Sequence, residues 1–124
     1  MRNKPHTVLL ADRNPRIRKF VQRELLSEGH EVVTAADAVQ LTAWLTSSVH
    51  LDALVVDPDM PGIENCDHLC SLLSSRPNLP VILHCLVSDE AAIPIESTRL
   101  LLIEKNGDST DGLKHLLSSL FKPA

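Results

Sequence analysis

A short apolar run that ends at an aspartate is the feature that most limits how this chain can fold. Residues 54–56 are Leu-Val-Val, Asp57 follows, and residues 58–62 form a proline- and glycine-containing turn. A run this short, rich in β-branched residues, is typical of a strand buried in a parallel sheet with both faces covered. Open α/β sheets bind ligands beyond the carboxyl ends of their strands. We therefore predict a functional role for Asp57.

Strand and helix patterns alternate along the whole chain. Strands are expected at 7–11, 31–34, 53–56, 80–85 and 100–103, and helices at 15–28, 37–48, 65–75, 88–93 and 109–121. Pro94 is expected to end or bend the fourth of these helices early. Alternation of this kind predicts an α/β fold with parallel strands and right-handed crossovers. The expected architecture is a five-stranded parallel sheet flanked by five helices.

Length and composition limit the class of protein. The 124 residues suit one domain, 1–124, with one sizeable core. A net charge of −4 gives no reason to expect direct nucleic-acid binding or a membrane surface as partner. No apolar run reaches the roughly 18 residues of a membrane span, and the polar N-terminus is unlike a signal peptide. We therefore expect a cytoplasmic protein with no membrane partner.

The cysteine pattern gives no sign of a disulfide framework. Cys66, Cys70 and Cys85 are an odd number and form no C-x-x-C unit. Reduced thiols are therefore expected. Cys66, His68 and Cys70 lie along one predicted helix, where Cys66 and Cys70 are one turn apart and could face one side. Three soft ligands without a second pair are only a weak zinc signal. Packing is the expected role of these side chains.

Four chemically active residues lie at the ends of predicted strands or directly after them. Asp12 follows the first strand and Asp57 the third, while Cys85 ends the fourth and Lys105 follows the fifth. The carboxyl ends of parallel strands share one edge of a sheet, so these side chains are expected to converge. Two carboxylates and an ammonium group suit a hard cation together with a phosphate-like anion.

The chain from about residue 7 to residue 120 resembles a response-regulator receiver domain of two-component signalling. The matching pieces are V-L-L-A-D-R-N-P at 8–15, D-P-D-M-P-G at 57–62, P-V-I at 80–82, and Lys105. The resemblance implies the flavodoxin-like, doubly wound fold of that family. It also implies a regulator and not an enzyme.

The resemblance further implies a role for each site residue. Asp57 would accept a phosphoryl group from a histidine kinase or phosphotransfer protein. Mg²⁺ would lie between Asp12, Asp57 and the backbone carbonyl of Asp59. Lys105 and Cys85 would bind the phosphoryl oxygens, Cys85 weakly because a thiol is a poor donor.

Arg13 is the most important departure from the receiver pattern. It stands where receivers have the second residue of an acidic pair. This change removes a metal ligand and adds a permanent cation, which makes Mg²⁺ binding uncertain. Two alternatives stay open. The Asp59 carboxylate could partly compensate, or Arg13 could pair with Asp57 or Asp59 and occupy the place of the metal.

Other departures leave two functions open. Leu102 replaces the usual aromatic switch residue, and Asn106 replaces the proline that usually follows the lysine. The first hypothesis is a phosphorylatable receiver. The alternative is a pseudo-receiver that acts as a phosphorylation-independent interaction module or homodimer. A nucleotide-binding protein is disfavoured, because the chain has no glycine-rich phosphate loop and only four glycines.

The first predicted helix is strongly basic. Its charges allow two interpretations, a solvated face or a docking surface for an acidic partner, and we slightly favour the solvated face. The basic side chains are Arg13, Arg16, Arg18, Lys19 and Arg23.

Overall fold

A computed structural model describes residues 5–85 and 100–122 of the chain. Within them, five parallel strands form one sheet in the order β2-β1-β3-β4-β5. This is the flavodoxin-like order of doubly wound sheets, and the chain reverses direction across the sheet between β1 and β3. The strands are β1 (Thr7–Ala11), β2 (Glu31–Ala35), β3 (Ala53–Val56), β4 (Val81–Cys85) and β5 (Leu100–Glu104).

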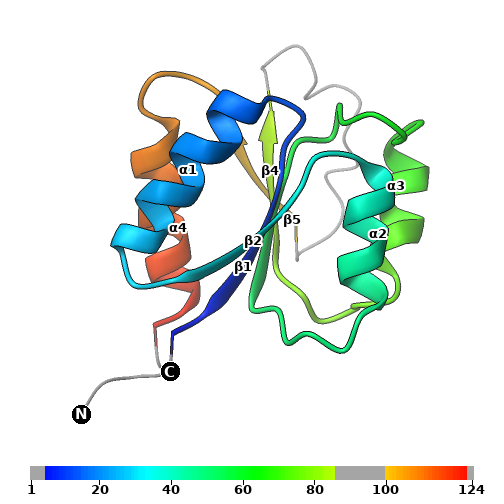
Figure 1. The fold of residues 1–124 in the computed structure, drawn as a ribbon, viewed down its shortest axis with the longest axis horizontal. Coiled ribbons are helices and arrows are strands. Elements are labelled where there is room, and N and C mark those ends of the chain that lie inside the picture. Colours follow the sequence, from blue (N-terminus) through cyan, green and yellow to red (C-terminus); the bar gives the residue numbers. More distant parts are fainter. Residues whose placement is uncertain (1–4, 86–99, 123–124) are drawn as a thin grey trace.

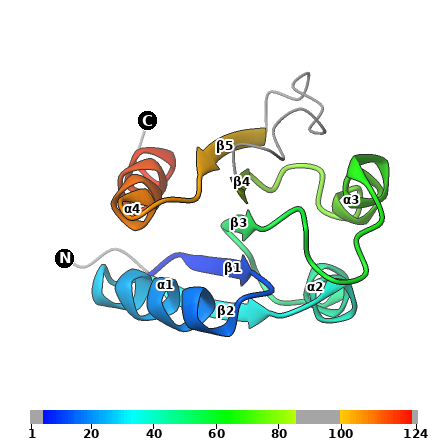
Figure 2. The ribbon, with the colours of Figure 1, turned by 90° about the horizontal axis from the view of Figure 1, so that it is seen from above.

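Helices cover both faces of the sheet (Figures 1 and 2). α1 (Pro15–Ser27) and α4 (Ser109–Leu120) lie on one face, and α2 (Ala38–Thr46) and α3 (Cys66–Leu73) lie on the other. The predicted α/β fold class and parallel sheet are confirmed. The described residues hold four helices where five were expected. The missing one, predicted at 88–93, lies outside the described residues.

Side-chain caps explain where three of the helices begin. Asn14 accepts from the backbone N–H groups of Arg16 and Ile17, and Pro15 takes the first helical position of α1. Asp37 caps α2, and Asn65 caps α3. The observed elements agree with the predicted ones to within one or two residues, the ordinary uncertainty of helix and strand ends.

Two hydrophobic clusters pack on opposite faces of the sheet. Alternate residues of each strand point to opposite faces, so Leu9 and Leu54 join one cluster while Val8 and Val55 join the other. Leu41, Leu69 and Leu73 complete the first cluster from α2 and α3. The second cluster is completed from α1 and α4 by Val21, Leu25, Leu113 and Leu117.

No helix of the described residues is both long and apolar enough to span a membrane.

The loop that follows β3 is fixed against the start of α2. The backbone N–H of Ala38 donates to the carbonyl of Pro61 at 2.9 Å. Gly62 has a φ of +90°, and a Cβ added there would come within 2.8 Å of the Ala38 Cβ. Both the backbone conformation and the space therefore require glycine. This contact holds in place the turn that begins at Asp57.

Candidate functional site

The site lies at the carboxyl edge of the sheet, where β1 and β3 are neighbours. The Asp12 N–H donates to the Ala35 carbonyl at 3.1 Å, and the Asp57 N–H donates to the Ala11 carbonyl at 2.8 Å. These backbone bonds extend the strand ladders by one residue. They place both carboxylates at the point where chain direction reverses across the sheet, where doubly wound proteins bind ligands.

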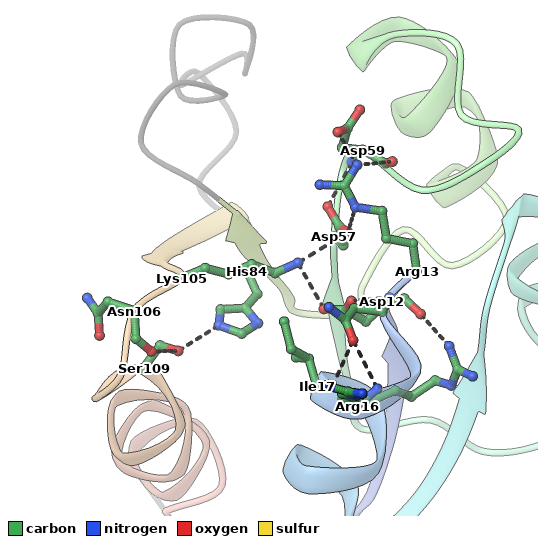
Figure 3. Close-up of polar contacts among 12 residues, drawn as sticks. Asp12, Arg13, Arg16, Ile17, Asp57, Asp59, His84, Lys105, Asn106 and Ser109 are labelled. Carbon is green, nitrogen blue, oxygen red and sulfur yellow. Dashed lines mark hydrogen bonds and ion pairs between the residues drawn. The ribbon is translucent and has the colours of Figure 1, made fainter.

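Lys105 joins the two carboxylates. Its Nζ lies 3.1 Å from Asp12 Oδ2 and 3.2 Å from Asp57 Oδ2 (Figure 3). Both aspartates are 1% exposed, and the lysine side chain is 11% exposed. The backbone holds the lysine in place, because its N–H donates to the Cys85 carbonyl at 2.7 Å. Asp12, Asp57 and Lys105 form what we call the inner cluster.

Backbone groups orient the two carboxylates of the inner cluster. Asp12 Oδ1 accepts from the Asn14 N–H at 2.9 Å, and Asp57 Oδ1 accepts from the Asp59 N–H at 3.0 Å. Each Oδ2 is left facing the lysine. Among the described residues neither Oδ2 accepts a hydrogen bond of ordinary geometry, so their contacts with Lys105 are ion pairs. Both Oδ2 atoms therefore face the Lys105 ammonium group at the centre of the inner cluster.

Arg13 forms a second layer of charge outside the inner cluster. Its Nε lies 3.4 Å from Asp57 Oδ2, and its Nη1 forms an ion pair with the Asp59 carboxylate. Figure 3 shows the guanidinium between the two acids. The Asp57 charge is the largest cause of a raised pKa for Arg13, and Asp59 adds to it. The arginine is 41% exposed and Asp59 is 58% exposed. We call Arg13 and Asp59 the outer pair.

The side chains, as they lie, do not fit a magnesium ion. Magnesium needs near-octahedral oxygen ligands, and the expected ones are Asp12, Asp57 and the Asp59 carbonyl. Arg13 already lies 3.4 Å from Asp57 Oδ2 and donates to the Asp59 carbonyl at 3.4 Å. In the described part of the chain, no three acidic, histidine or cysteine side chains are grouped to hold a metal. Of the two alternatives for Arg13, the structure has the one in which it pairs with both acids.

The other predicted site residues lie near this edge with different surroundings. Cys85 is fully buried in the cluster beneath α2 and α3, and its carbonyl binds the Lys105 N–H. Leu102 is partly exposed on β5. Asn106 follows the lysine and accepts the Asp108 N–H on its side chain at 2.8 Å. The part of Cys85 in phosphoryl binding stays a prediction.

His84 is a buried polar residue that sequence reasoning did not identify as part of the site. Its Nε2 lies 2.9 Å from Ser109 Oγ, and that hydroxyl donates to the Asn106 carbonyl at 2.9 Å. Because a hydroxyl has a single proton, Nε2 is the donor of the first bond. Strand alternation could have given a clue, since it turns His84 toward α1 and α4 when Cys85 faces α2 and α3.

These two hydrogen bonds place a proton on Nε2 of His84, and the surroundings of the ring decide whether Nδ1 is protonated too. Its Nδ1 is buried and has no partner among the described residues. Burial lowers the pKa of the ring, and the nearby charge of Lys105 lowers it further. His84 is therefore a neutral link between β4 and the loop that carries Lys105.

A groove of about 470 Å³ opens beside the site, between α1 and the loop before α4. Ile17, Phe20 and Val21 give it an apolar wall, and Arg16 and Lys105 add positive charge. His84 forms part of its lining. The groove places an apolar, basic surface directly beside the inner cluster.

The basic charges of α1 do not all face solvent. Arg13 binds the site acids, and Arg18 donates from Nη1 to the Asp12 carbonyl at 2.8 Å. Arg16 and Lys19 are exposed. The solvated-face interpretation is therefore wrong for Arg13. For Arg16 and Lys19, exposure agrees with a solvated face and with a docking surface alike, so both interpretations stay predictions.

The weak zinc signal on α3 is not supported in the described part of the chain, which holds no such ligand group. His68 Nδ1 accepts the Glu64 N–H at 3.1 Å, so that nitrogen is already used. Burial raises the pKa of the Cys66 thiol, which keeps it in the less reactive protonated form.

Known structures share this fold. The response regulator TrrA of Thermotoga maritima, solved in complex with Mg²⁺–BeF, is 23% identical and has a TM-score of 0.76; the match covers 94% of this chain and 99% of that one. The signal receiver domain of an HD domain-containing protein from Pseudomonas fluorescens Pf-5 is 21% identical and has a TM-score of 0.79, covering 97% and 90%. The chain therefore has the fold of response-regulator receiver domains, and the predicted resemblance to that class is confirmed.

One curated protein also matches in sequence. TcrX of Mycobacterium tuberculosis, described as a probable transcriptional regulatory protein, is 34% identical over 79 residues. The match covers 64% of this chain and 33% of TcrX, so the chain spans only about a third of that relative's length. No protein-family model matches the chain.

Proposed function

We propose that this chain is a receiver-type signalling domain whose Asp57 accepts a phosphoryl group from a histidine kinase or phosphotransfer protein. Phosphorylation would then alter the binding of a partner in the cytoplasm, and the domain would act as a regulator and not as an enzyme. One observation carries the proposal. A buried carboxylate at the switch point of the sheet faces the Lys105 ammonium group at 3.2 Å.

The side chains present suit this reaction. An Asp57 oxygen would attack phosphorus, forming the P–O bond while the P–N bond to the donor imidazole breaks. The electron pair goes to the imidazole nitrogen, which is released as the donor's histidine. Charge develops on the phosphoryl oxygens, and Lys105 lies where a fixed cation can stabilise it.

The surface beside the inner cluster suits a partner that approaches Asp57. The groove offers an apolar wall with Phe20, and Arg16 and Lys105 give it positive charge. Lys19 and Arg23 extend the basic surface along α1. An acidic helical surface carrying a phosphohistidine is complementary to such a groove.

Intact-mass spectrometry after incubation with acetyl phosphate tests the proposal. We expect one added phosphoryl group on the wild-type chain and none on Asp57→Asn, which keeps the shape of the residue but is a poor nucleophile. Asp59→Asn is the matched control, because it removes a neighbouring carboxylate of the outer pair and leaves Asp57 intact. It should still take up the group.

Failure of every phosphodonor on a sample that circular dichroism shows to be folded would contradict phosphoryl transfer. Phosphorylation of the Asp57→Asn variant would place the acceptor elsewhere. Histidine kinases incubated with ATP and the chain provide the corresponding test of the partner.

A pseudo-receiver is the second candidate, and the position of Arg13 favours it. The guanidinium lies between Asp57 and Asp59, and Asp57 is almost inaccessible to solvent. In this function the chain would bind a partner or a second copy of itself without phosphorylation. Sedimentation of the wild-type chain and Asp57→Asn, each with and without acetyl phosphate, distinguishes the two functions. The donor should change the assembly of a phosphorylatable receiver in the wild type alone, and that of a pseudo-receiver in neither protein.

A further inference from the structure

The charges at the site are almost balanced without any bound ion. Asp12, Asp57 and Asp59 contribute three negative charges, and Lys105 and Arg13 contribute two positive charges. Each carboxylate contacts at least one of the two cations. A site in which only carboxylates converge would need a bound cation to relieve their repulsion. Here side chains already supply that charge.

The position of Arg13 is specific. Its Nε lies 3.4 Å from Asp57 Oδ2, and its Nη1 contacts both the carboxylate and the carbonyl of Asp59. These are two of the three groups that the receiver resemblance assigns to a metal. The arginine therefore engages the same oxygens that a hard divalent cation would need.

We propose that Arg13 is a built-in cation that takes the place of a divalent metal, so that Mg²⁺ or Mn²⁺ binds only when Arg13 is displaced. The inference concerns charge and metal binding. It therefore holds whether or not Asp57 accepts a phosphoryl group.

The physical reason is competition for Asp57 Oδ2. That oxygen already lies 3.2 Å from Lys105 Nζ and 3.4 Å from Arg13 Nε. A divalent ion there would lie close to both positive charges, beside an Asp57 carboxylate that is almost inaccessible to solvent, and repulsion is stronger where water is excluded. Arginine keeps its charge at any working pH, so deprotonation of Arg13 cannot remove this repulsion. Only movement of the Arg13 side chain frees the oxygen.

Titration with Mn²⁺, monitored through the relaxation rate of water protons, tests this inference without using any reaction. Arg13→Asp removes the cation and adds an oxygen ligand. We expect Mn²⁺ binding at least about tenfold tighter in this variant than in the wild-type chain, the scale on which such sites respond to ligand changes. Arg13→Ala removes the cation alone and should give a smaller gain of the same sign.

Arg16→Asp is the matched control. It makes the same charge change on an exposed residue of the first turn of α1 that forms no ion pair with Asp57 or Asp59 in the described part of the chain. We expect no comparable gain in Mn²⁺ affinity. The double variant Arg13→Asp/Asp57→Asn should lose the gain in Mn²⁺ affinity, because Asp57 is the oxygen ligand for which the metal and Arg13 compete.

Three results would overturn the inference. The first is Mn²⁺ binding by the wild-type chain as tight as that of Arg13→Asp and dependent on Asp57. The second is a gain in Arg16→Asp equal to that in Arg13→Asp. The third is folded Arg13→Asp and Arg13→Ala proteins that bind Mn²⁺ no better than the wild type. Because phosphoryl uptake is measured separately by mass, its failure would leave this inference standing.

Discussion

The inner cluster and the outer pair hold the same kinds of charge in very different surroundings. Asp12 and Asp57 are 1% exposed and Lys105 is 11% exposed, whereas Arg13 and Asp59 are 41% and 58% exposed. Breaking a buried ion pair leaves an uncompensated charge away from water, but an exposed pair is screened and adds little stability. The inner cluster should therefore matter for folding, and the outer pair mainly for what the site binds.

Removal of Lys105 should have the largest effect on stability. Lys105→Met leaves two buried carboxylates close together with no inner cation. We expect the free energy of unfolding at neutral pH to fall by about 3–5 kcal/mol, the usual result of breaking a buried pair from one side. Urea denaturation followed by the fluorescence of Trp44 measures the change.

A second substitution separates charge from packing in that result. Adding Asp12→Asn to Lys105→Met removes one of the two carboxylate charges, and we expect it to restore part of the lost stability. If the double variant is as unstable as the sum of the two single ones, the lysine contributes by packing and the inner cluster is not an electrostatic unit.

Loss of the hydrogen bond between His84 and Ser109 should have the next largest effect on stability. Ser109→Ala removes the only acceptor of the His84 Nε2–H found among the described residues. An unsatisfied buried donor costs about 1–3 kcal/mol, and we expect a loss of that size in urea denaturation. Ser118→Ala, exposed on the same helix, is the control and should change little. Equal losses in both would mean that helix α4, and not the hydrogen bond, is responsible.

The sequence predicted the inner cluster better than the outer pair, and the reason is geometric. Strand ends in a parallel sheet converge whatever their side chains are, so Asp12, Asp57 and Lys105 could be placed together from the alternation of elements. The direction of an exposed, flexible arginine has no such rule. The sequence therefore left open whether Arg13 points to solvent, to Asp57 or to Asp59.

His84 shows a second limit of sequence reasoning. Its position facing α1 and α4 follows from strand alternation. Its partner Ser109 lies 25 residues away and depends on how the loop after Lys105 turns. No periodicity in the sequence encodes that turn. The fold itself was easier to predict from the sequence, because helix caps and apolar runs are local signals. Of the predicted elements, only the helix expected at 88–93 lies outside the described residues.

The buried histidine should also make stability depend on pH. Burial and Lys105 lower the pKa of folded His84 below its ordinary value, which is about 6.5. As pH falls below that value, the unfolded chain binds a proton that the folded chain does not, so the free energy of unfolding decreases. At pH values above the ordinary pKa of histidine, His84 is neutral in both the folded and the unfolded chain, so this loss of stability is absent. His30, whose pKa is also lowered by burial, acts in the same direction.

Stability measured between pH 7 and pH 5 tests this dependence. His84→Gln keeps a side-chain N–H that can reach Ser109 but does not titrate, and we expect a shallower loss of stability on acidification. His30→Asn removes the other contribution and serves for comparison. If the wild type and His84→Gln lose stability in parallel, His84 takes up a proton as readily in the folded chain as in the unfolded one.

Arg13→Ala should have the smallest effect on folding. The outer pair is exposed, and such pairs are worth at most about 1 kcal/mol, so urea denaturation should show a loss within that limit. A double-mutant cycle with Asp59→Ala should give a coupling of similar size. A loss as large as that of Lys105→Met would mean that Arg13 belongs to the inner cluster. A small loss together with tighter Mn²⁺ binding would show that one residue can change the ligand of this site without being needed for the fold.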